Sequence, residues 1–296
     1  MFKSPSNLKA SHLLPAIAVA LCGVMWGVFW YPLRWFDGQG VGGGWVSLMF
    51  NAVAAAAPLP WLMHRKAWEG FAGQALTGLF LGSAFSLYTV SLVMTDVIHA
   101  ILLFYLTPVW STLAGWLFRS ERLKLSRIIA MALGFAGMGC ILGLNDGLPL
   151  PHNAGDWVAL MSGMLWATGT LRSFAMPYPG IALPVFTFSI GGLVSSAIIL
   201  AFGAGLAMPL ASTGNFVHAL PWIILLAMII FVPPNFLVLW AAQRMDPGRV
   251  GILLMTEVLV GSISAALFSG EAFGMIELAG TVLIVCAGLI EVLGRR

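Results

Sequence analysis

The stretch Pro247–Glu271, PGRVGILLMTEVLVGSISAALFSGE, predicts a membrane-spanning helix with Glu257 close to its middle. A helix of about 20 mainly apolar residues is long enough to cross the hydrocarbon core of a bilayer. Glu257 is the one acidic residue that falls deep inside a long apolar run. A charge at the bilayer centre costs roughly 2.5–3.5 kcal/mol on insertion scales, so a carboxyl at this depth indicates a functional site.

A second stretch of the chain aligns with this one at a constant offset of 150 residues. Ala100–Glu121, AILLFYLTPVWSTLAGWLFRSE, matches Val250–Glu271, and Thr107 then corresponds to Glu257. The pattern predicts an internal duplication in which only the second copy carries the buried carboxyl group.

The composition is that of an integral membrane protein. Apolar residues make up 60% of the 296 residues and charged residues 8%, against roughly 45–50% and about 25% in soluble domains. The net charge of +3 therefore concerns orientation in the membrane, and we expect no nucleic-acid partner. The three cysteines all lie in apolar runs and show neither a disulfide framework nor metal-ligand spacing.

Hydropathy predicts ten membrane spans joined by short connections. The candidate spans are residues 13–34, 43–63, 72–94, 97–118, 126–144, 156–176, 182–203, 218–241, 248–268 and 275–293. No soluble domain fits between them, so we expect an all-α integral membrane protein.

The basic residues predict the orientation of these spans. With ten spans both termini lie on the same side, and Arg34 is the one of the 14 Lys and Arg residues that falls on the other side. The remaining 13 share the side that the positive-inside rule assigns to the cytoplasm. They are Lys3, Lys9, Arg65, Lys66, Arg119, Arg122, Lys124, Arg127, Arg172, Arg244, Arg249, Arg295 and Arg296.

Two five-span halves enter the membrane from opposite sides. Gly23–Gly27, GVMWG, echoes Gly163–Ala167, GMLWA, at an offset of 140, so the duplication extends beyond the first pair of matched stretches. Inverted-topology repeats are typical of secondary transporters. We therefore expect a first five-helix repeat over residues 1–146 and a second, inverted repeat over residues 147–296.

Four motifs resemble those of ten-span EamA-type members of the drug/metabolite transporter superfamily. They are WGVFWYPLR from Trp26, LTPVWSTLAGWLFRSE from Leu106, GDWVALMSGMLWATGTLR from Gly155 and MTEVLVGSISAALFSGE from Met255. The resemblance covers essentially the whole chain and implies export of amino acids or other small metabolites.

One position departs from that family pattern. Family members often have proline directly after the glutamate of the ninth span, where this chain has Val258, whereas the first copy does have Pro108. We therefore expect a helix break near the midplane in the span at 97–118 rather than in the span at 248–268.

We predict that Glu257 contacts the substrate and exchanges the coupling proton. The alternative is a structural carboxyl group that is hydrogen-bonded between helices. The side chains expected to complete a central substrate site are Trp26, Trp30, Trp166, Tyr88, Tyr105, Asn51 and Asn235.

Each of these candidates has an alternative structural role. Aromatic faces pack apolar groups and attract ammonium groups, but the same rings serve helix packing or, for Trp30, an interfacial belt. A buried amide such as Asn51 needs hydrogen-bond partners, which an interhelical contact also supplies. Asn235 follows Pro233 and Pro234, which remove two backbone donors and predict a kink.

These features favour a secondary transporter that moves a small metabolite by alternating access. The sequence has no nucleotide-binding motif, so the energy would come from a substrate or ion gradient, and we expect no cofactor, no metal and no catalytic residue. The alternative within this class is uptake of a vitamin or other nutrient. Other classes, less favoured, are an intramembrane lipid-modifying enzyme, for which no Ser–His or His–Asp pairing is present, and a receptor or scaffold subunit.

The expected setting is the bacterial cytoplasmic (inner) membrane. The partners would be the lipid bilayer and a small-molecule substrate, and the protein would be a monomer or a homodimer.

Overall fold

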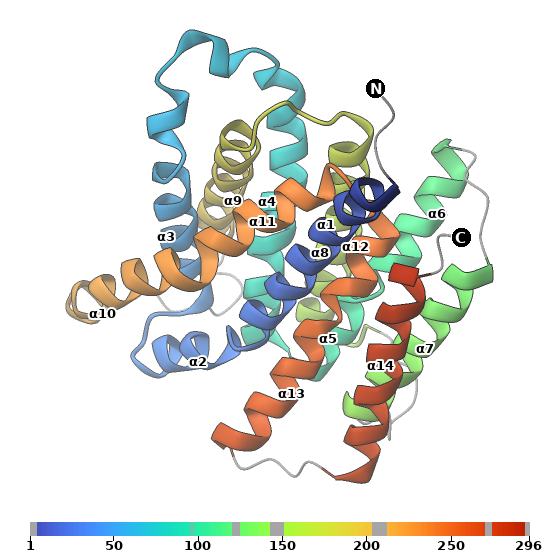
Figure 1. Ribbon diagram of the computed structural model, residues 1–296. Helices are drawn as coiled ribbons and strands as arrows, with labels where there is room; N and C mark the ends of the chain where they lie inside the picture. Colours follow the sequence, from blue (N-terminus) through green and yellow to red (C-terminus); the bar gives the residue numbers. More distant parts are fainter. Residues whose placement is uncertain are drawn as a thin grey trace.

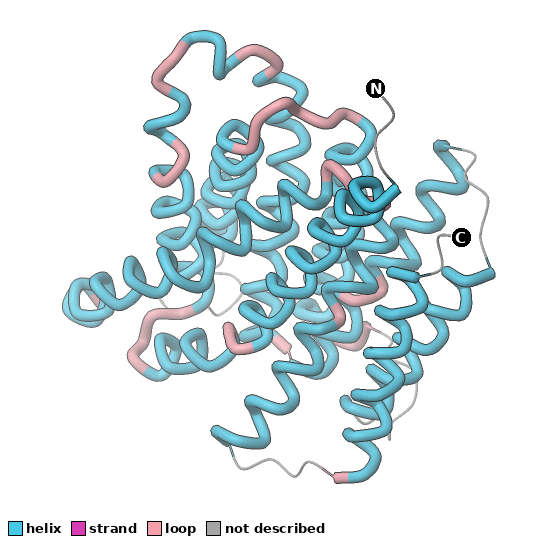
Figure 2. The backbone as a smooth tube through the Cα atoms, viewed as in Figure 1, coloured by secondary structure: helices cyan, strands magenta, loops and turns pink. Residues whose placement is uncertain are grey.

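The computed structural model describes residues 5–95, 97–119, 125–142, 151–202, 212–269 and 274–293. All regular secondary structure within these ranges is helical (Figure 1, Figure 2). The predicted boundary between the two halves, at residues 146 and 147, lies outside the described residues.

The helices follow one another along the chain with short connections. The first half holds α1 (Pro5–Gly27), α2 (Trp30–Gly38), α3 (Gly43–Ala56), the 3₁₀ turns η1 (Leu59–Leu62) and η2 (Arg65–Trp68), α4 (Phe71–Met94), α5 (Val97–Phe104), α6 (Thr107–Arg119) and α7 (Leu125–Leu142). The second holds α8 (Ala154–Ala175), α9 (Ala182–Phe202), α10 (Thr213–Leu226), the π-helical turn η4 (Ala227–Phe231), α11 (Val232–Ala242), α12 (Pro247–Leu254), α13 (Thr256–Ser269) and α14 (Met275–Leu293).

Four helical stretches of the described chain are long and apolar enough to cross a membrane. They are Leu13–Gly38, Phe71–Leu92, Ala182–Phe202 and Thr213–Ala242, and shorter apolar helices occupy Gly43–Ala56, Leu125–Cys140 and Leu278–Ile290. The predicted spans at 97–118 and 248–268 are each divided into two pieces of 8 to 14 residues. A single piece of that length falls short of the roughly 20 residues that a span needs.

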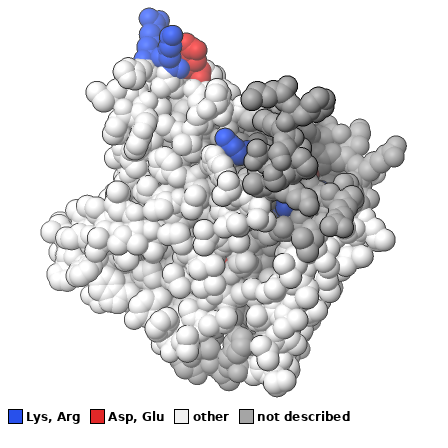
Figure 3. Space-filling model, viewed as in Figure 1, with Lys and Arg blue, Asp and Glu red and all other residues white. Residues whose placement is uncertain are grey.

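The surface has the character expected of a multi-pass membrane protein. Large apolar side chains are strongly exposed, such as Leu14 at 61%, Ile198 at 53% and Trp222 at 51%. In Figure 3 charged side chains gather at one end of the molecule, over the segment between α3 and α4 that includes Arg65 and Lys66. A monomeric soluble protein rarely exposes so much contiguous apolar surface, whereas lipid covers it in a membrane.

The helices of the two halves pack in reciprocal pairs. α3 packs against α9, and α7 packs against α14, whose ribbons run side by side in Figure 1. α4 packs against α8 while α1 packs against α11, and α6 packs against α8 while α1 packs against α13. The predicted duplication matches α1 with α8, α3 with α9, α4 with α11, α6 with α13 and α7 with α14. Exchanging each helix for its match converts the α4–α8 pair into the α1–α11 pair and the α6–α8 pair into the α1–α13 pair. The same exchange leaves the α3–α9 and α7–α14 pairs unchanged.

Small residues bring α4 and α9 into backbone contact. A Cβ atom on Gly78 would collide with backbone atoms of Thr187 and Phe188, and one on Gly82 with the carbonyl oxygen of Phe188. One on Gly191 would collide with the carbonyl of Gly78. Side chains larger than hydrogen at these positions would push the two helices apart.

A double proline bends the stretch from Thr213 to Ala242. Pro233 and Pro234 have no backbone N–H, so two carbonyls of the preceding turn lose their helical donors. The chain accommodates this loss with the π-helical turn η4, which directly precedes α11. π-turns are one of the recognised causes of helix kinks, and this turn lies where the sequence predicts a kink.

Breaks occur in both of the matched stretches and not only in the first. α5 ends at Phe104 and α6 begins at Thr107, while α12 ends at Leu254 and α13 begins at Thr256. The expectation of a break in the span at 97–118 rather than in the span at 248–268 was therefore wrong for the second of them. The two α-helices before the breaks end at residues that are 150 positions apart, so the second break is the counterpart of the first although Val258 replaces proline.

Candidate functional site

Glu257 lies in the first turn of α13, directly after the second helix break. Its two carboxyl oxygens face two tyrosine hydroxyls. The hydroxyl of Tyr88 in α4 lies 3.2 Å from Oε1, and that of Tyr105, at the first helix break, lies 2.5 Å from Oε2. The structure therefore brings three of the predicted site residues together, from stretches that are distant in the sequence.

The surroundings of this carboxyl group are protein rather than lipid. Tyr88 and Tyr105 are 6% and 1% exposed, and Glu257 is partly buried. The backbone of Glu257 abuts α1, because a Cβ atom on Gly27 would lie 2.8 Å from the Glu257 carbonyl oxygen. Intramembrane ionisable groups face the interior of a helix bundle and pair with one another or with other polar groups, and Glu257 follows this rule.

Backbone groups at the two breaks are satisfied by side chains. The hydroxyl of Thr107 donates to the carbonyl of Phe104 at 2.6 Å, and that of Thr256 donates to the carbonyl of Leu253 at 2.9 Å. The Tyr105 hydroxyl lies 2.9 Å from the carbonyl of Leu254. Interrupted helices at membrane depth require such partners, because the hydrocarbon offers none.

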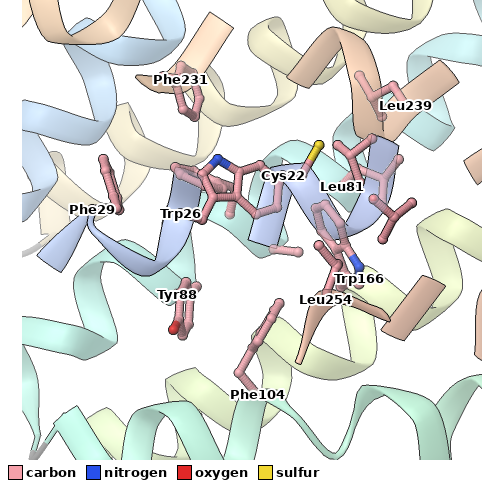
Figure 4. Packing of buried hydrophobic residues seen from close by; sticks show 14 of the residues in the cluster. Cys22, Trp26, Phe29, Leu81, Tyr88, Phe104, Trp166, Phe231, Leu239 and Leu254 are labelled. Atoms are coloured by element: carbon pink, nitrogen blue, oxygen red, sulfur yellow. The ribbon is translucent and has the colours of Figure 1, made fainter. Parts of the chain in front are cut away.

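Aromatic rings pack together beside Tyr88, and Figure 4 shows Trp26, Tyr88, Phe104 and Trp166 in the same part of the buried interior. The ring centroids of Tyr88 and Phe104 are 4.4 Å apart, and those of Trp26 and Trp166 are 6.1 Å apart. Phe104 lies 6.3 Å from Trp166 and joins the two pairs. The predicted residues Trp26 and Trp166 thus belong to one aromatic cluster with Tyr88.

The indole N–H groups of Trp26 and Trp166 are buried without a hydrogen-bond partner in the described structure. The two side chains are 7% and 2% exposed. A buried donor of this kind costs free energy unless something accepts its hydrogen bond, so each unpartnered donor calls for an explanation. A bound substrate with acceptor oxygens would provide one.

Trp30 occupies a different place from the other predicted aromatic residues. Its indole N–H donates to the hydroxyl of Ser264 at 2.9 Å, and its ring packs edge-on against Tyr31. Ser264 lies about two turns beyond Glu257 in α13. These contacts of Trp30 connect the start of α2 with the C-terminal part of α13. They do not involve the Glu257 carboxyl group.

Asn51 is fully buried in a second polar cluster, between α3, α4 and α9. Its amide nitrogen donates to the carbonyl of Ser47 at 2.8 Å. The hydroxyls of Ser47, Ser86 and Ser196 lie 3.0–3.2 Å from one another. Sequence reasoning did not identify these serines, because single serines in apolar runs carry no pattern that distinguishes them. Asn51 belongs to this cluster, and its hydrogen bonds in the described structure are to Ser47 and not to the Glu257 group.

Asn235 is fully buried in α11, and neither end of its amide has a hydrogen-bond partner in the described structure. The neighbouring Pro234 carbonyl accepts a hydrogen bond from the thiol of Cys22 at 3.3 Å. Cys22 lies one turn before Trp26 in α1. Asn235 therefore directly follows Pro234, which contacts the helix that carries Trp26. Its unsatisfied amide is the strongest structural sign that it contacts a ligand.

The sequence did not single out Phe104 or Leu254, whose carbonyls end the two half-helices. Their signal was present in the offset of 150, because the two residues correspond at that offset and each is the last residue of the helix before a break. Among the described residues, no group of three or more His, Cys, Asp and Glu side chains is placed to hold a metal ion.

The fold has relatives among solved structures. One protein of known crystal structure superposes with a TM-score of 0.71 over 95% of this chain and 97% of its own, at 18% sequence identity. At this identity the likeness shows the fold alone. No curated protein matches the chain at a significant level.

Residues 13–143 match the model of the EamA-like transporter family. The members of that family are described as transporters. Over these residues the match confirms the resemblance to EamA-type members of the drug/metabolite transporter superfamily that the sequence motifs predicted.

Proposed function

We propose that the protein is a secondary transporter whose substrate site is centred on Glu257. The observation that carries this proposal is the position of the Glu257 carboxyl group, bonded to Tyr88 and Tyr105 where both matched helices are interrupted. Discontinuous helices at the bilayer midplane form the substrate sites of many secondary transporters.

The proposed architecture is ten spans in two inverted five-helix repeats, with both termini in the cytoplasm. The reciprocal packing of the helices supports a two-fold relation between the halves. So do two close approaches: a Cβ atom on Gly23 would lie 3.2 Å from the carbonyl oxygen of Leu254, and one on Gly163 would lie 2.7 Å from that of Phe104. Gly23 corresponds to Gly163 at the offset of 140, and Phe104 corresponds to Leu254 at the offset of 150.

The chemistry of the site favours a small molecule that combines an ammonium group with an apolar part. A carboxylate and the faces of Trp and Tyr rings attract a positive charge, and the rings around it pack apolar groups. The free N–H groups of Trp26 and Trp166 would donate hydrogen bonds to the oxygens of a carboxylate. Amino acids and related compounds have all three features, and the family resemblance supports export as the direction.

Glu257 is also the proposed proton-exchanging group. Among the described residues that contact one another in this cluster it is the one carboxyl, so it is the group whose charge changes most readily with pH. Competition between a proton and a cationic substrate for the same carboxylate would couple their movements in opposite directions.

The test is transport in liposomes that contain the purified protein. Labelled amino acids, amines and vitamins are offered with and without a pH gradient, and flux is measured in both directions. We expect flux of one or more amino acids that increases with an opposing proton gradient. Glu257→Gln should abolish the proton-driven part while the protein remains folded, and Glu69→Gln, which removes an exposed carboxylate in a loop, should leave it intact.

Two results would contradict this proposal. Unchanged proton-driven flux in Glu257→Gln would exclude the carboxyl group as the coupling site. Absence of flux for every compound, together with turnover of a lipid substrate, would favour an intramembrane enzyme instead.

A further inference from the structure

The hydroxyl of Tyr105 has two acceptors within reach and one hydrogen to donate. It lies 2.5 Å from Oε2 of Glu257 and 2.9 Å from the carbonyl oxygen of Leu254. A phenolic hydroxyl donates a single hydrogen bond, although its oxygen can also accept one. Both contacts therefore are hydrogen bonds at the same time only when the Glu257 carboxyl group is protonated and donates to Tyr105, which leaves the tyrosine hydrogen for Leu254.

Leu254 is the last residue of α12, directly before the second helix break. In a continuous α-helix the amide of Val258 would donate to the carbonyl of Leu254. Here the Val258 amide donates to the carbonyl of Met255, at 3.0 Å, so the regular pattern changes at this junction. The Tyr105 hydroxyl adds a side-chain donor to the Leu254 carbonyl at this point.

At the first helix break, the last carbonyl of α5 accepts a hydrogen bond from a donor that does not depend on pH. Phe104 is the counterpart of Leu254, and Thr107 is the counterpart of Glu257, at the offset of 150. The Thr107 hydroxyl donates to the Phe104 carbonyl at 2.6 Å, and a threonine hydroxyl keeps its hydrogen at every physiological pH. In the second copy the same position holds a carboxyl group, which can donate only while it is protonated.

We propose that Tyr105 transmits the protonation state of Glu257 to the junction between α12 and α13. While Glu257 is protonated, it donates to Tyr105, and Tyr105 donates to Leu254 and closes the junction. When the proton leaves, the Tyr105 hydrogen turns to the carboxylate, and the Leu254 carbonyl loses its donor. The junction then opens more readily, which gives the transporter a backbone movement that is linked to one proton.

This inference rests on the proposed role of Glu257 as the proton-exchanging group and adds the route by which its charge reaches the backbone. Tyr105 acts here as a positioning residue.

In the described contacts, Tyr105 is the one residue that connects the Glu257 carboxyl group with the junction between α12 and α13. Tyr88 bonds only the other carboxyl oxygen, at 3.2 Å. In the helices packed against α13, the thiol of Cys22 donates to the Pro234 carbonyl and Arg127 pairs with Asp246. The remaining titratable side chains that the structure places in these helices are those of Cys140 and Cys286.

The test combines two measurements on the full-length protein in lipid nanodiscs over a pH series, without substrate. Infrared difference spectroscopy follows the carboxyl band that Glu257→Gln removes. Hydrogen–deuterium exchange follows the backbone amides of residues 254–259, corrected for the intrinsic effect of pH on exchange. In the wild type we expect exchange at the junction to rise on the order of tenfold as Glu257 ionises, the change that loss of one hydrogen bond of about 1.4 kcal/mol produces.

Three variants sharpen the result. Tyr105→Phe should remove the pH-dependent step in exchange while the Glu257 band still titrates. Tyr88→Phe, the matched control, removes the hydroxyl on the other oxygen and should retain the step. Glu257→Gln carries a donor at every pH, so its junction should stay protected throughout the series, a result that does not depend on whether Tyr105→Phe folds.

The outcomes separate this inference from the proposed function. A pH-dependent step that persists in Tyr105→Phe, or an unprotected junction in Glu257→Gln, would overturn the role of Tyr105 and leave the proton role of Glu257 standing. A Glu257 band that does not titrate over the accessible pH range would overturn both.

Discussion

The hydroxyl of Tyr105 and the carbonyl of Leu254 lie 2.9 Å apart, although 149 positions separate the two residues in the sequence. Tyr105 stands at the break of one matched helix, and Leu254 ends the first part of the other. Each break also packs against a glycine from the first helix of the opposite half, Gly163 for Phe104 and Gly23 for Leu254. The two halves therefore stabilise each other's interrupted helices.

The first prediction concerns the permanent donor at the first break. Thr107→Val keeps the side-chain shape and removes the hydroxyl that donates to the Phe104 carbonyl at 2.6 Å. A buried carbonyl that loses its donor costs about 1–3 kcal/mol, so we expect a lower melting temperature in detergent. Thr168→Val removes a hydroxyl that bonds within its own helix on an exposed face and should have little effect. Equal melting temperatures for the two variants would contradict the role assigned to Thr107.

The second prediction uses the glycines that face the two breaks. An added methyl group at Gly163 would lie 2.7 Å from the Phe104 carbonyl oxygen, and one at Gly23 would collide with Thr256. We expect Gly23→Ala and Gly163→Ala each to destabilise the protein by about 1–3 kcal/mol through overpacking, as measured by thermal unfolding. Gly214→Ala, where no atom lies within 4 Å of the new methyl group, is the control. A harmless substitution at one of the paired glycines would show that the two breaks are not packed equivalently.

The third prediction separates ligand binding from folding at Asn235. Its buried amide has no hydrogen-bond partner in the described structure, so Asn235→Leu removes unsatisfied polar atoms and keeps a similar volume. We expect an unchanged or higher melting temperature, because removal of an unpartnered buried polar group is neutral or stabilising. Transport of the substrate found in liposomes should fall at least tenfold. A stable variant with full transport would exclude Asn235 from the substrate site.

The fourth prediction concerns the start of α12, where Asp246 serves two purposes. Its carboxylate accepts the Gly248 amide hydrogen at 2.9 Å as a helix cap and pairs with Arg127 at 3.1 Å. Asp246→Asn keeps an acceptor for the cap and loses the ion pair, so we expect a loss of about 0–1 kcal/mol. Asp246→Ala also removes the cap and should cost about 1 kcal/mol more. Thermal unfolding at low and high salt distinguishes the contributions, since only the ion pair is screened; equal losses for both variants would argue against the cap.

The linear sequence was sufficient for the membrane character, and it predicted the duplication and singled out Glu257. These are patterns of composition and spacing, and they persist whatever the helices pack against. Pro108 also marked the first break, because proline removes a backbone donor within the helix itself. The same local logic led to the wrong expectation for the second matched stretch, where Val258 permits a continuous helix.

Tertiary structure decided the second break and the composition of the site. The break at Met255 lies where Gly23 brings α1 against the backbone of the second matched helix and where the Tyr105 hydroxyl reaches the Leu254 carbonyl. The same packing places Tyr88 and Tyr105 on separate oxygens of Glu257, and it places Asn51 among buried serines instead. Most of these outcomes depend on contacts between residues that are far apart in the chain, and the local sequence does not specify which of them meet.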